Sequence, residues 1–293
     1  MTTSVGFVGI GHMGEPMADR LLDGPWELRV VSRTAAKADR LVARGAKRAW
    51  SLADLADCDV VITMLGTDDD LRTVVDGFLA HDRLPGLLVD CSTVSAEVSL
   101  EVLARLQERG GDLLAAPVAG GPSVIAGGGL AMIVSGTRSA FDRVRPVLAA
   151  MAPRLVHTGP GALSRHVKIL HNLVAAVLLH SLAEVGVLAE AAGIHRTDVL
   201  DFIGAGALGS RFVDYKAKAM ASLDFTPAIA APLLLKDVDL GLALARTHGV
   251  TLDLTPVTRG ALARLVEHGH GDLDAAALLL DIAAANGVAL DPG

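Results

Sequence analysis

Short apolar runs alternate with amphipathic segments along the first half of the chain. Runs of this length, bounded by turn residues, are typical of strands buried on both faces of a sheet, and the segments between them carry apolar residues at helical spacing. The runs predict strands at residues 5–10, 28–32, 60–64, 87–90, 113–116 and 131–135. The segments between them predict helices at residues 52–56, 71–79, 96–109 and 141–151. Strand and helix in alternation indicate an α/β fold with a doubly wound parallel sheet.

From residue 161 the pattern changes to long apolar helices without convincing strands. Residues 162–192 predict one long helix that is buried around most of its circumference and ends at Gly193 as a C-cap. The later periodic segments predict helices at residues 197–203, 211–221, 230–247, 256–267 and 275–285. We therefore expect an α/β domain over residues 1–160 and an all-helical domain over residues 161–293.

The long helix also bears on assembly. A mostly apolar helix of this length is hard to bury within one small domain, and its alanines offer small faces for close packing. We therefore expect a homodimer, or a higher homo-oligomer, that covers this helix. The alternative is that the helix is simply central to its own domain.

Composition narrows the class of protein. At 293 residues, with 51% hydrophobic and 20% charged residues, the chain is long enough for two globular domains. A net charge of −7 argues against a nucleic-acid partner, and the longest stretch without a charge, residues 113–137, is too rich in Gly and Pro to span a membrane. Cys58 and Cys91 are too few for a disulfide framework, and we see no secretory signal, so we expect a cytoplasmic protein.

The clearest motif follows the first predicted strand, where the chain reads Gly9-x-Gly11-x-x-Gly14. Gly9 would allow a tight turn, Gly11 would let backbone approach a pyrophosphate, and Gly14 would let the next helix pack on the strand. With a helix N-terminus directed at the phosphates, this arrangement predicts a Rossmann-type dinucleotide site. Residues 1–160 are therefore expected to be a dinucleotide-binding Rossmann domain, which leaves the helical residues 161–293 for substrate binding and dimerisation. The spacing alone is weak evidence and depends on the strand before it and the helix after it. The residues expected to bind the coenzyme here are Gly9, Ile10, Gly11, His12, Met13 and Gly14.

The end of the second predicted strand indicates which dinucleotide binds. NAD sites usually place Asp or Glu about 20 residues after the glycines, but this strand ends in Ser32, Arg33 and Thr34, with Lys37 one turn further on. Because Arg can hold a 2′-phosphate through several donors, we expect NADP(H) as the coenzyme. The alternative is that Arg33 is only a solvated loop residue. The end of the third predicted strand should lie beneath the adenosine side, which adds Met64, Leu65 and Gly66.

A candidate for proton transfer begins the long helix near the domain junction. Lys168 and Asn172 are four residues apart, so they share one helical face. In an apolar cleft the pKa of such a lysine falls toward neutrality, which would let it act as a general acid or base. The alternative is a lysine that extends to the surface beside a solvated asparagine.

Over essentially its whole length the chain resembles the β-hydroxyacid dehydrogenase family, which includes 3-hydroxyisobutyrate dehydrogenases and NADP-linked semialdehyde reductases. The resemblance is carried by five motifs in the family's order, at residues 6–18, 31–34, 90–93, 168–172 and 236–240. It implies that Lys168 is the catalytic acid/base and that Asn172 binds the substrate. It further implies that Ser92 and Thr93 lie beside the nicotinamide and the substrate, and that Lys236 approaches the coenzyme.

One element departs from the family pattern. Where the family usually reads Asp-Ala-Pro-Val-Ser-Gly-Gly, this chain has Ala115 and Ala119 in place of the Asp and the Ser. That Ser normally helps to hold the substrate carboxylate, and its loss removes an interaction worth about 1.5–3 kcal/mol. The glycines that follow either mark a mere turn or offer backbone amides to an anion. In the second case the substrate-binding residues of this loop are Gly120, Gly121 and Ser123.

Three functions remain open at this stage. The first is an NADP(H)-dependent oxidoreductase that transfers a hydride between the nicotinamide and a small β-hydroxyacid or its semialdehyde. The second is an NADPH-dependent imine reductase, against which Lys168 argues and for which Ala119 argues slightly. The third is a non-catalytic NADP-binding protein. No spacing of His, Cys and Asp resembles a zinc site, and Asp68-Asp69-Asp70 is more typical of a helix N-terminus than of a metal site.

Overall fold

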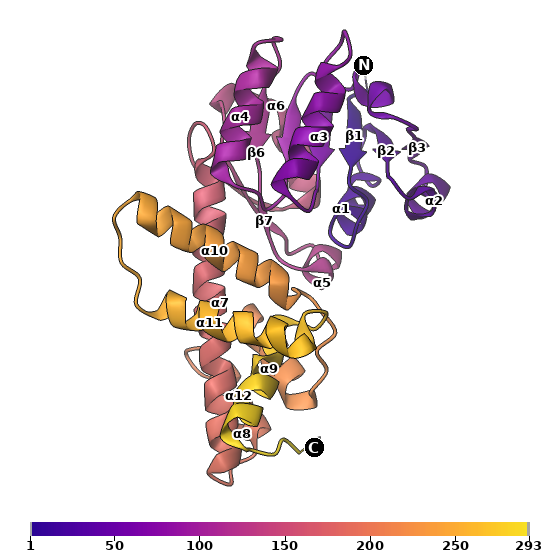
Figure 1. The fold of residues 1–293 in the computed structure, drawn as a ribbon. Helices are drawn as coiled ribbons and strands as arrows, with labels where there is room; N and C mark the ends of the chain where they lie inside the picture. Colours follow the sequence, from indigo (N-terminus) through magenta and orange to yellow (C-terminus); the bar gives the residue numbers. More distant parts are fainter. Residues whose placement is uncertain (1, 292–293) are drawn as a thin grey trace. The chain divides into compact units, whose positions relative to one another are not determined.

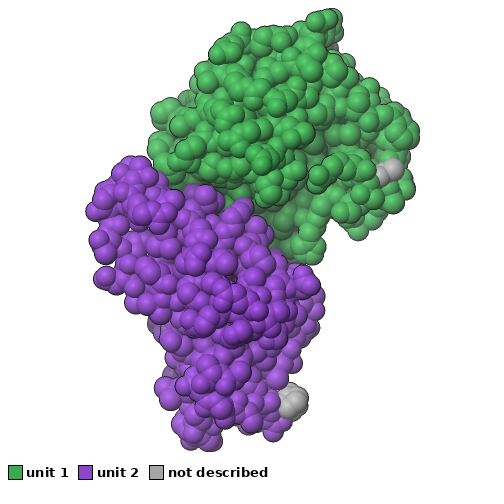
Figure 2. Space-filling model, in the orientation of Figure 1, with its two compact units in different colours: residues 1–168 green, residues 169–293 purple. Residues whose placement is uncertain are grey.

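The computed structural model describes residues 2–291, except for the side chains of Ala35 and Ser123. The chain forms two compact units, residues 1–168 and residues 169–293 (Figure 2). The first unit is an α/β unit and the second is helical (Figure 1).

The first unit is built on a parallel sheet of six strands in the order β3-β2-β1-β4-β5-β6 (Figure 1). The strands are β1 (Ser4–Val8), β2 (Glu27–Val31), β3 (Lys47–Arg48), β4 (Val60–Thr63), β5 (Leu88–Asp90) and β6 (Leu113–Ala115). The chain moves outward from β1 to β3, then returns to β4 on the other side of β1. This reversal of direction confirms the Rossmann-type doubly wound sheet, and it leaves a crevice-forming switch point between β1 and β4.

Helices cover both faces of this sheet and explain why its strands are apolar on both sides. One face packs against α1 (Gly14–Leu21), α2 (Ala35–Ala43) and α6 (Arg138–Met151). The other packs against η1 (Leu52–Leu55), α3 (Asp68–Leu79) and α4 (Ala96–Gln107). Within β4, Val60 and Ile62 belong to the first core and Val61 to the second, so every residue of this strand is buried. Alternating side chains in a strand point to opposite faces, which produces this division.

The last predicted strand of this unit does not join the main sheet as expected. It forms β8 (Ala131–Val134), which lies in a separate three-stranded sheet between β7 (Val118–Ala119) and β9 (Arg154–His157). The segment between β7 and β8 holds only the short helix α5 (Pro122–Ala126), and a connection this short favours antiparallel pairing over a parallel crossover. The two sheets meet at an antiparallel bridge between Ala115 and Ser135.

The predicted helix at residues 162–192 is observed as α7 (Leu163–Ala191). As expected, it ends at a left-handed glycine: Gly193 has φ +75°, and the Ile194 amide donates to the Ala189 carbonyl at 2.9 Å. Five more α-helices follow within the described residues: α8 (Arg196–Ala205), α9 (Arg211–Ser222), α10 (Ala231–Thr247), α11 (Leu254–Leu265) and α12 (Leu278–Asn286). The helices of residues 169–291 pack around one apolar core, with α10 and α11 side by side (Figure 1).

A buried arginine ties three of these helices together. The Arg196 side chain is fully buried at the start of α8 and pairs with Glu190 near the end of α7, Nη1 to Oε1 at 2.8 Å. Its other donors reach the carbonyls of Met220 and Ala221 at the end of α9, at 3.0 and 2.8 Å. The guanidinium therefore caps α9 while it neutralises a carboxylate that is itself mostly buried.

The burial of α7 differs from the sequence-based expectation. A stripe of apolar side chains lies exposed along it: Leu170 is 52%, Val174 69% and Leu188 68% exposed. The prediction of a helix buried around most of its circumference was wrong for one protomer, because apolar spacing does not reveal whether a face is covered by the same chain. Among residues 2–291, α7 is also the one helix long and apolar enough to cross a membrane, although half of its most apolar 18-residue window is buried, as in the core helix of a globular domain.

Candidate coenzyme and substrate site

The glycine motif forms the loop between β1 and α1 at the switch point of the sheet. Gly9 has φ +97°, and a Cβ there would overlap the Met64 carbonyl. A Cβ on Gly14 would overlap the Gly9 carbonyl oxygen, whereas a Cβ on Gly11 would meet no atom within 4 Å. Two glycines are thus required by the fold itself, and the third leaves the backbone open at the start of a helix. This is a cradle that suits a pyrophosphate.

The start of α1 keeps the electrostatics that an anion needs. No side-chain hydrogen bond caps this helix at Met13 in the described structure, and of its first amides that of Glu15 donates to the Gly11 carbonyl of the loop at 2.9 Å. The one acidic residue of the first turn, Glu15, is paired with Arg40 of α2 at 3.2 Å. The positive end of the helix dipole therefore faces the glycine loop.

The residues predicted to bind the 2′-phosphate of the coenzyme lie at and just after the end of β2. Arg33 is 94% exposed, and its Nη1 lies 3.6 Å from Oδ1 of Asp70 in the first turn of α3. Ser32 Oγ accepts from the Thr34 amide at 3.3 Å, and Lys37 is exposed in the first turn of α2. The ends of β2 and β4 are thus brought to the same edge of the sheet, and an exposed guanidinium lies there beside a carboxylate.

The segment after β4 contacts both the glycine loop and the end of β5. The Met64 amide donates to the Val8 carbonyl at 2.9 Å, and the Leu65 amide donates to Ser92 Oγ at 2.8 Å. The expected acidic helix start is confirmed here, because α3 begins at Asp68 and Thr67 caps it. The structure therefore brings together three of the predicted coenzyme segments.

Ser92 lies deeper than the resemblance implied. It is fully buried, and its hydroxyl donates to Asp90 Oδ1 at 2.6 Å while it accepts from the Leu65 amide. The Ser92 hydroxyl thus already has one donor and one acceptor partner within the protein, and its contact with the substrate stays a prediction. Thr93, the next residue, is partly exposed.

A second group of predicted residues lies in the helical unit. Asn172 of α7 is buried, and its Nδ2 donates to Asp237 Oδ2 of α10 at 2.6 Å. Its Oδ1 lies 3.0 Å from His171 Nδ1. Lys236 Nζ lies 3.6 Å from the other oxygen of Asp237. Asp237 is the residue that the sequence reasoning missed, although its position directly after Lys236 was visible. It fixes the plane of the Asn172 amide and joins two predicted residues.

Lys168 and the loop after β7 complete the predicted set. Lys168 is partly exposed on α7, one turn before Asn172. Gly120 has φ +133°, and a Cβ there would lie 2.8 Å from Val124, while Gly121 has open space around its Cα. The Ser123 side chain lies outside the described residues. The loop therefore requires its first glycine, and its second leaves backbone exposed to a ligand.

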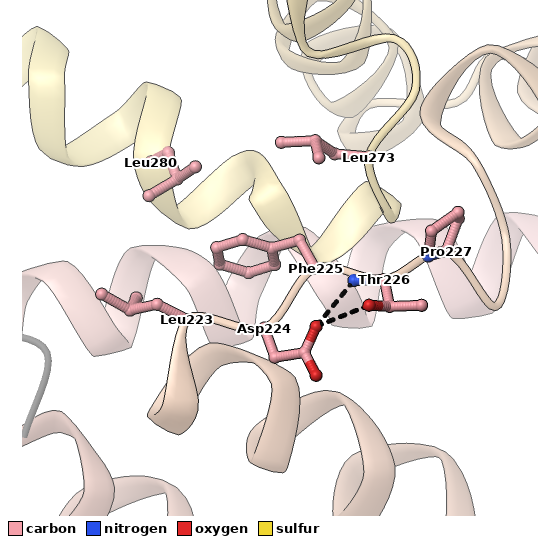
Figure 3. A pocket seen from close by; sticks show the side chains of 7 residues that line it. All are labelled: Leu223, Asp224, Phe225, Thr226, Pro227, Leu273 and Leu280. Atoms are coloured by element: carbon pink, nitrogen blue, oxygen red, sulfur yellow. Dashed lines mark hydrogen bonds between the residues drawn. The ribbon is translucent and has the colours of Figure 1, made fainter.

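One pocket of about 520 Å³ lies within the helical unit and contains none of the predicted site residues (Figure 3). Its walls are mostly apolar, and its carboxylate, Asp224, already accepts from the amide and the hydroxyl of Thr226 at 3.0 and 2.7 Å. One of the two carboxylate oxygens is thus used in a local turn, and apart from Asp224 and Thr226 the lining side chains are apolar, so the pocket lacks the convergent polar groups of a substrate site. The pocket is lined by Leu223, Asp224, Phe225, Thr226, Pro227, Leu273 and Leu280.

Two family models together cover most of the chain. Residues 4–159 match the NAD binding domain of 6-phosphogluconate dehydrogenase, and residues 163–281 match the NAD-binding domain of NADP-dependent 3-hydroxyisobutyrate dehydrogenase. The chain belongs to the 3-hydroxyisobutyrate dehydrogenase family. It is therefore a pyridine-nucleotide-dependent oxidoreductase, and the family expected from the sequence is confirmed.

Individual relatives show the range of this family. The chain is 30% identical over 281 residues to an NAD-dependent L-serine dehydrogenase of Pseudomonas aeruginosa, which covers 92% of this chain and 94% of the relative. A solved structure of Mycobacterium tuberculosis 3-hydroxyisobutyrate dehydrogenase with L-serine has a TM-score of 0.85 and 31% identity, over 96% of this chain and 99% of that one. An imine reductase of Streptomyces aurantiacus has a TM-score of 0.62 and 25% identity, over 96% and 99% of the two chains.

Proposed function

We propose that this protein interconverts a small β-hydroxyacid and its semialdehyde, with NADP(H) as coenzyme. The observation that carries the proposal is the presence, in a chain of this family, of two features that hydride transfer requires. The glycine loop at the switch point is open at Gly11, and Lys168 lies one turn before Asn172 on α7, where Asp237 holds the Asn172 amide. When bound, the nicotinamide exchanges a hydride with the carbon that bears the substrate oxygen.

Lys168 is proposed to move the proton at that oxygen. In the oxidative direction it accepts the hydroxyl proton as the carbon loses its hydride, and in the reductive direction it returns the proton. Asn172, with its amide held by Asp237, orients the substrate oxygen and the lysine. Thr93 and the amides of Gly120 and Gly121 hold the carboxylate end.

The preference for NADP(H) is supported by Arg33, at the end of β2. In the free protein its nearest ion-pair partner is Asp70, and so exposed a pair contributes little stability. A 2′-phosphate carries more charge than one carboxylate and accepts several hydrogen bonds, so it would displace Asp70 from this guanidinium. Ser32, Thr34 and Lys37 supply further donors nearby.

A kinetic screen tests the reaction. NADP⁺ and NAD⁺ are offered with 3-hydroxyisobutyrate, L-serine and other β-hydroxyacids, and NADPH is offered with short semialdehydes and cyclic imines. We expect turnover of a hydroxyacid or semialdehyde, faster with NADP(H). Lys168→Ala should lower kcat by about 10²–10⁴ with almost unchanged coenzyme affinity, because only proton transfer is lost. Full activity of this variant would contradict the assignment.

Imine reduction is the second candidate. It is supported by the likeness to an imine reductase and by Ala119, which stands where a carboxylate-binding hydroxyl is usual in the family. Ala119→Ser separates the two: under the first proposal it strengthens binding of hydroxyacids, which lowers their KM. Turnover of a cyclic imine with no turnover of any hydroxyacid would favour the second.

A further inference from the structure

The first unit contains a fully buried guanidinium that the proposed reaction does not use. Arg165 is 1% exposed and lies in the first turn of α7, three residues before Lys168. Its Nε donates to Ser99 Oγ at 3.0 Å, its Nη1 to the Ser92 carbonyl, and its Nη2 to a carboxylate oxygen of Asp90. Each nitrogen of the fork thus has a partner, and the partners come from the end of β5 and from α4.

The carboxylate of Asp90 extends this network toward the coenzyme segment. Its Oδ1 accepts from the hydroxyl of Thr63, at the end of β4, and from the hydroxyl of Ser92, each at 2.6 Å. Ser92 Oγ in turn accepts from the Leu65 amide at 2.8 Å. One chain of hydrogen bonds therefore runs from the base of α7 to the segment after β4, entirely within residues 1–168.

Stability alone is a poor explanation for such a pair. Taking two charges out of water costs about as much as their attraction returns, and an apolar pair of similar volume is often as stable. An apolar pair would lack the directional hydrogen bonds that this guanidinium makes to a hydroxyl, a carbonyl and a carboxylate. The network joins the first turn of α7, which carries the proposed proton-transfer residue, to the segment after β4, which is proposed to bind the coenzyme.

We infer that the buried Arg165–Asp90 pair is a positioning element, which fixes Lys168 through α7 and the Leu65 segment through Ser92. This inference rests on the proposed function for its effect on turnover. The network has two parts, which act on different steps. The Arg165 arm consists of the contacts of Arg165 with Ser92, Ser99 and Asp90, and the Ser92 arm is the contact of the Ser92 hydroxyl with the Leu65 amide. The Arg165 arm sets the place of the proton-transfer residue, and the Ser92 arm sets the shape of the coenzyme site.

Variants of Arg165 and Asp90 distinguish a positioning role of this pair from a role in stability alone. Arg165→Met leaves a buried carboxylate without its cation, so it should lower both stability and kcat. The double variant Arg165→Met, Asp90→Asn removes both charges, so the urea midpoint should recover most of the loss. We expect kcat to stay at least tenfold below that of the wild type, because a displaced acid/base remains displaced. Recovery of kcat together with stability would show that the pair only holds the fold, and would overturn the inference.

A matched control lies in the helical unit. Lys216 and Asp274 form another buried ion pair, and Asp274 also accepts from the amides of Ala228, Ile229 and Ala276, none of which is a proposed site residue. The double variant Lys216→Met, Asp274→Asn should change the urea midpoint by about as much as the double variant Arg165→Met, Asp90→Asn does. It should leave kcat within about twofold of the wild type. An equal loss of kcat in this control would mean that activity follows stability generally, which would also overturn the inference.

The Ser92 arm is tested by binding, without turnover. Ser92→Ala leaves the Leu65 amide without its acceptor, and we expect the dissociation constant for NADPH, from its fluorescence, to rise about tenfold. The pH dependence of kcat should keep its wild-type midpoint, because Arg165 still holds α7. An unchanged dissociation constant would refute this arm. If the wild type turned over no substrate, the proposed function would fail while this binding result remained decisive.

Discussion

Gly11 and Gly14 offer a direct test of the glycine loop, because alanine at the two positions should fail in different ways. A Cβ on Gly14 would overlap the Gly9 carbonyl oxygen and lie 3.1 Å from its carbon and 3.2 Å from Phe7 Cε1. Backbone stands on one side and a core ring on the other, so neither neighbour can move cheaply. Overpacking of this kind costs about 1–3 kcal/mol. Gly14→Ala should therefore lower the free energy of unfolding by that amount.

Gly11→Ala should spare the fold. Its Cβ would meet no protein atom within 4 Å, and its φ is not left-handed. Alanine at a compatible position stabilises a protein by about 0.4–1 kcal/mol through the unfolded chain. The same methyl would occupy the space through which a pyrophosphate approaches the backbone. We expect at least a tenfold weaker affinity for NADPH, or about 1.4 kcal/mol.

Two measurements on the same preparations test this pair: urea unfolding followed by circular dichroism, and titration of NADPH fluorescence. The expected result is a stable Gly11→Ala protein that binds coenzyme weakly, beside a destabilised Gly14→Ala protein. Wild-type affinity in a folded Gly11→Ala protein would refute the reasoning, since the open space at Gly11 would then not be where the pyrophosphate lies.

Three further outcomes follow from other parts of the molecule. Arg33→Ala should weaken NADP(H) binding at least tenfold and NAD(H) binding less than twofold, and equal losses would mean that the 2′-phosphate is read elsewhere. Burial raises the pKa of Glu190, but hydrogen bonds from Arg196 outweigh it and leave that pKa below the usual 4.5. The ionised Glu190 carboxylate therefore stabilises the folded protein above about pH 4.5, and this stabilisation is lost as the pH falls through the folded pKa. The free energy of unfolding in urea should accordingly depend less steeply on pH, between pH 5 and pH 3, in Glu190→Gln than in the wild type. Val174→Asp, on the exposed stripe of α7, should convert a homodimer to a monomer in sedimentation with little loss of stability, and a monomeric wild type would contradict the proposed dimer.

The sequence predicted the main sheet well because its strands are buried on both faces. Val60, Val61 and Ile62 are all interior, so the strand appears as an unbroken apolar run. The strands β3 and β7 have two residues each and carry no such pattern. The apolar residues of β8 did predict a strand, but an apolar run does not indicate which strands it pairs with.

The candidate site was predictable only where a motif is local. Gly9, Gly11 and Gly14 lie within six residues of one another, and each has the surroundings that its place in the motif requires. Arg165 and Asp90 are 75 residues apart, and neither residue alone indicates an ion pair. The partners of Ser92 were hidden in part for the same reason: Asp90 lies only two residues before it, but the Leu65 amide that donates to its hydroxyl is 27 residues away in the sequence.

The two edges of the main sheet also affect the tendency of this chain to aggregate at high concentration. An exposed strand edge is a template for pairing with another molecule, which leads to aggregation. On one side the sheet ends in β3, only two residues long and both of them cationic, Lys47 and Arg48. On the other side β6 is closed by Ser135, whose amide and carbonyl both pair with Ala115 at 2.8 and 3.0 Å. Neither edge offers a long ladder of unpaired backbone groups, so the sheet resists growth by addition of a strand from a second chain.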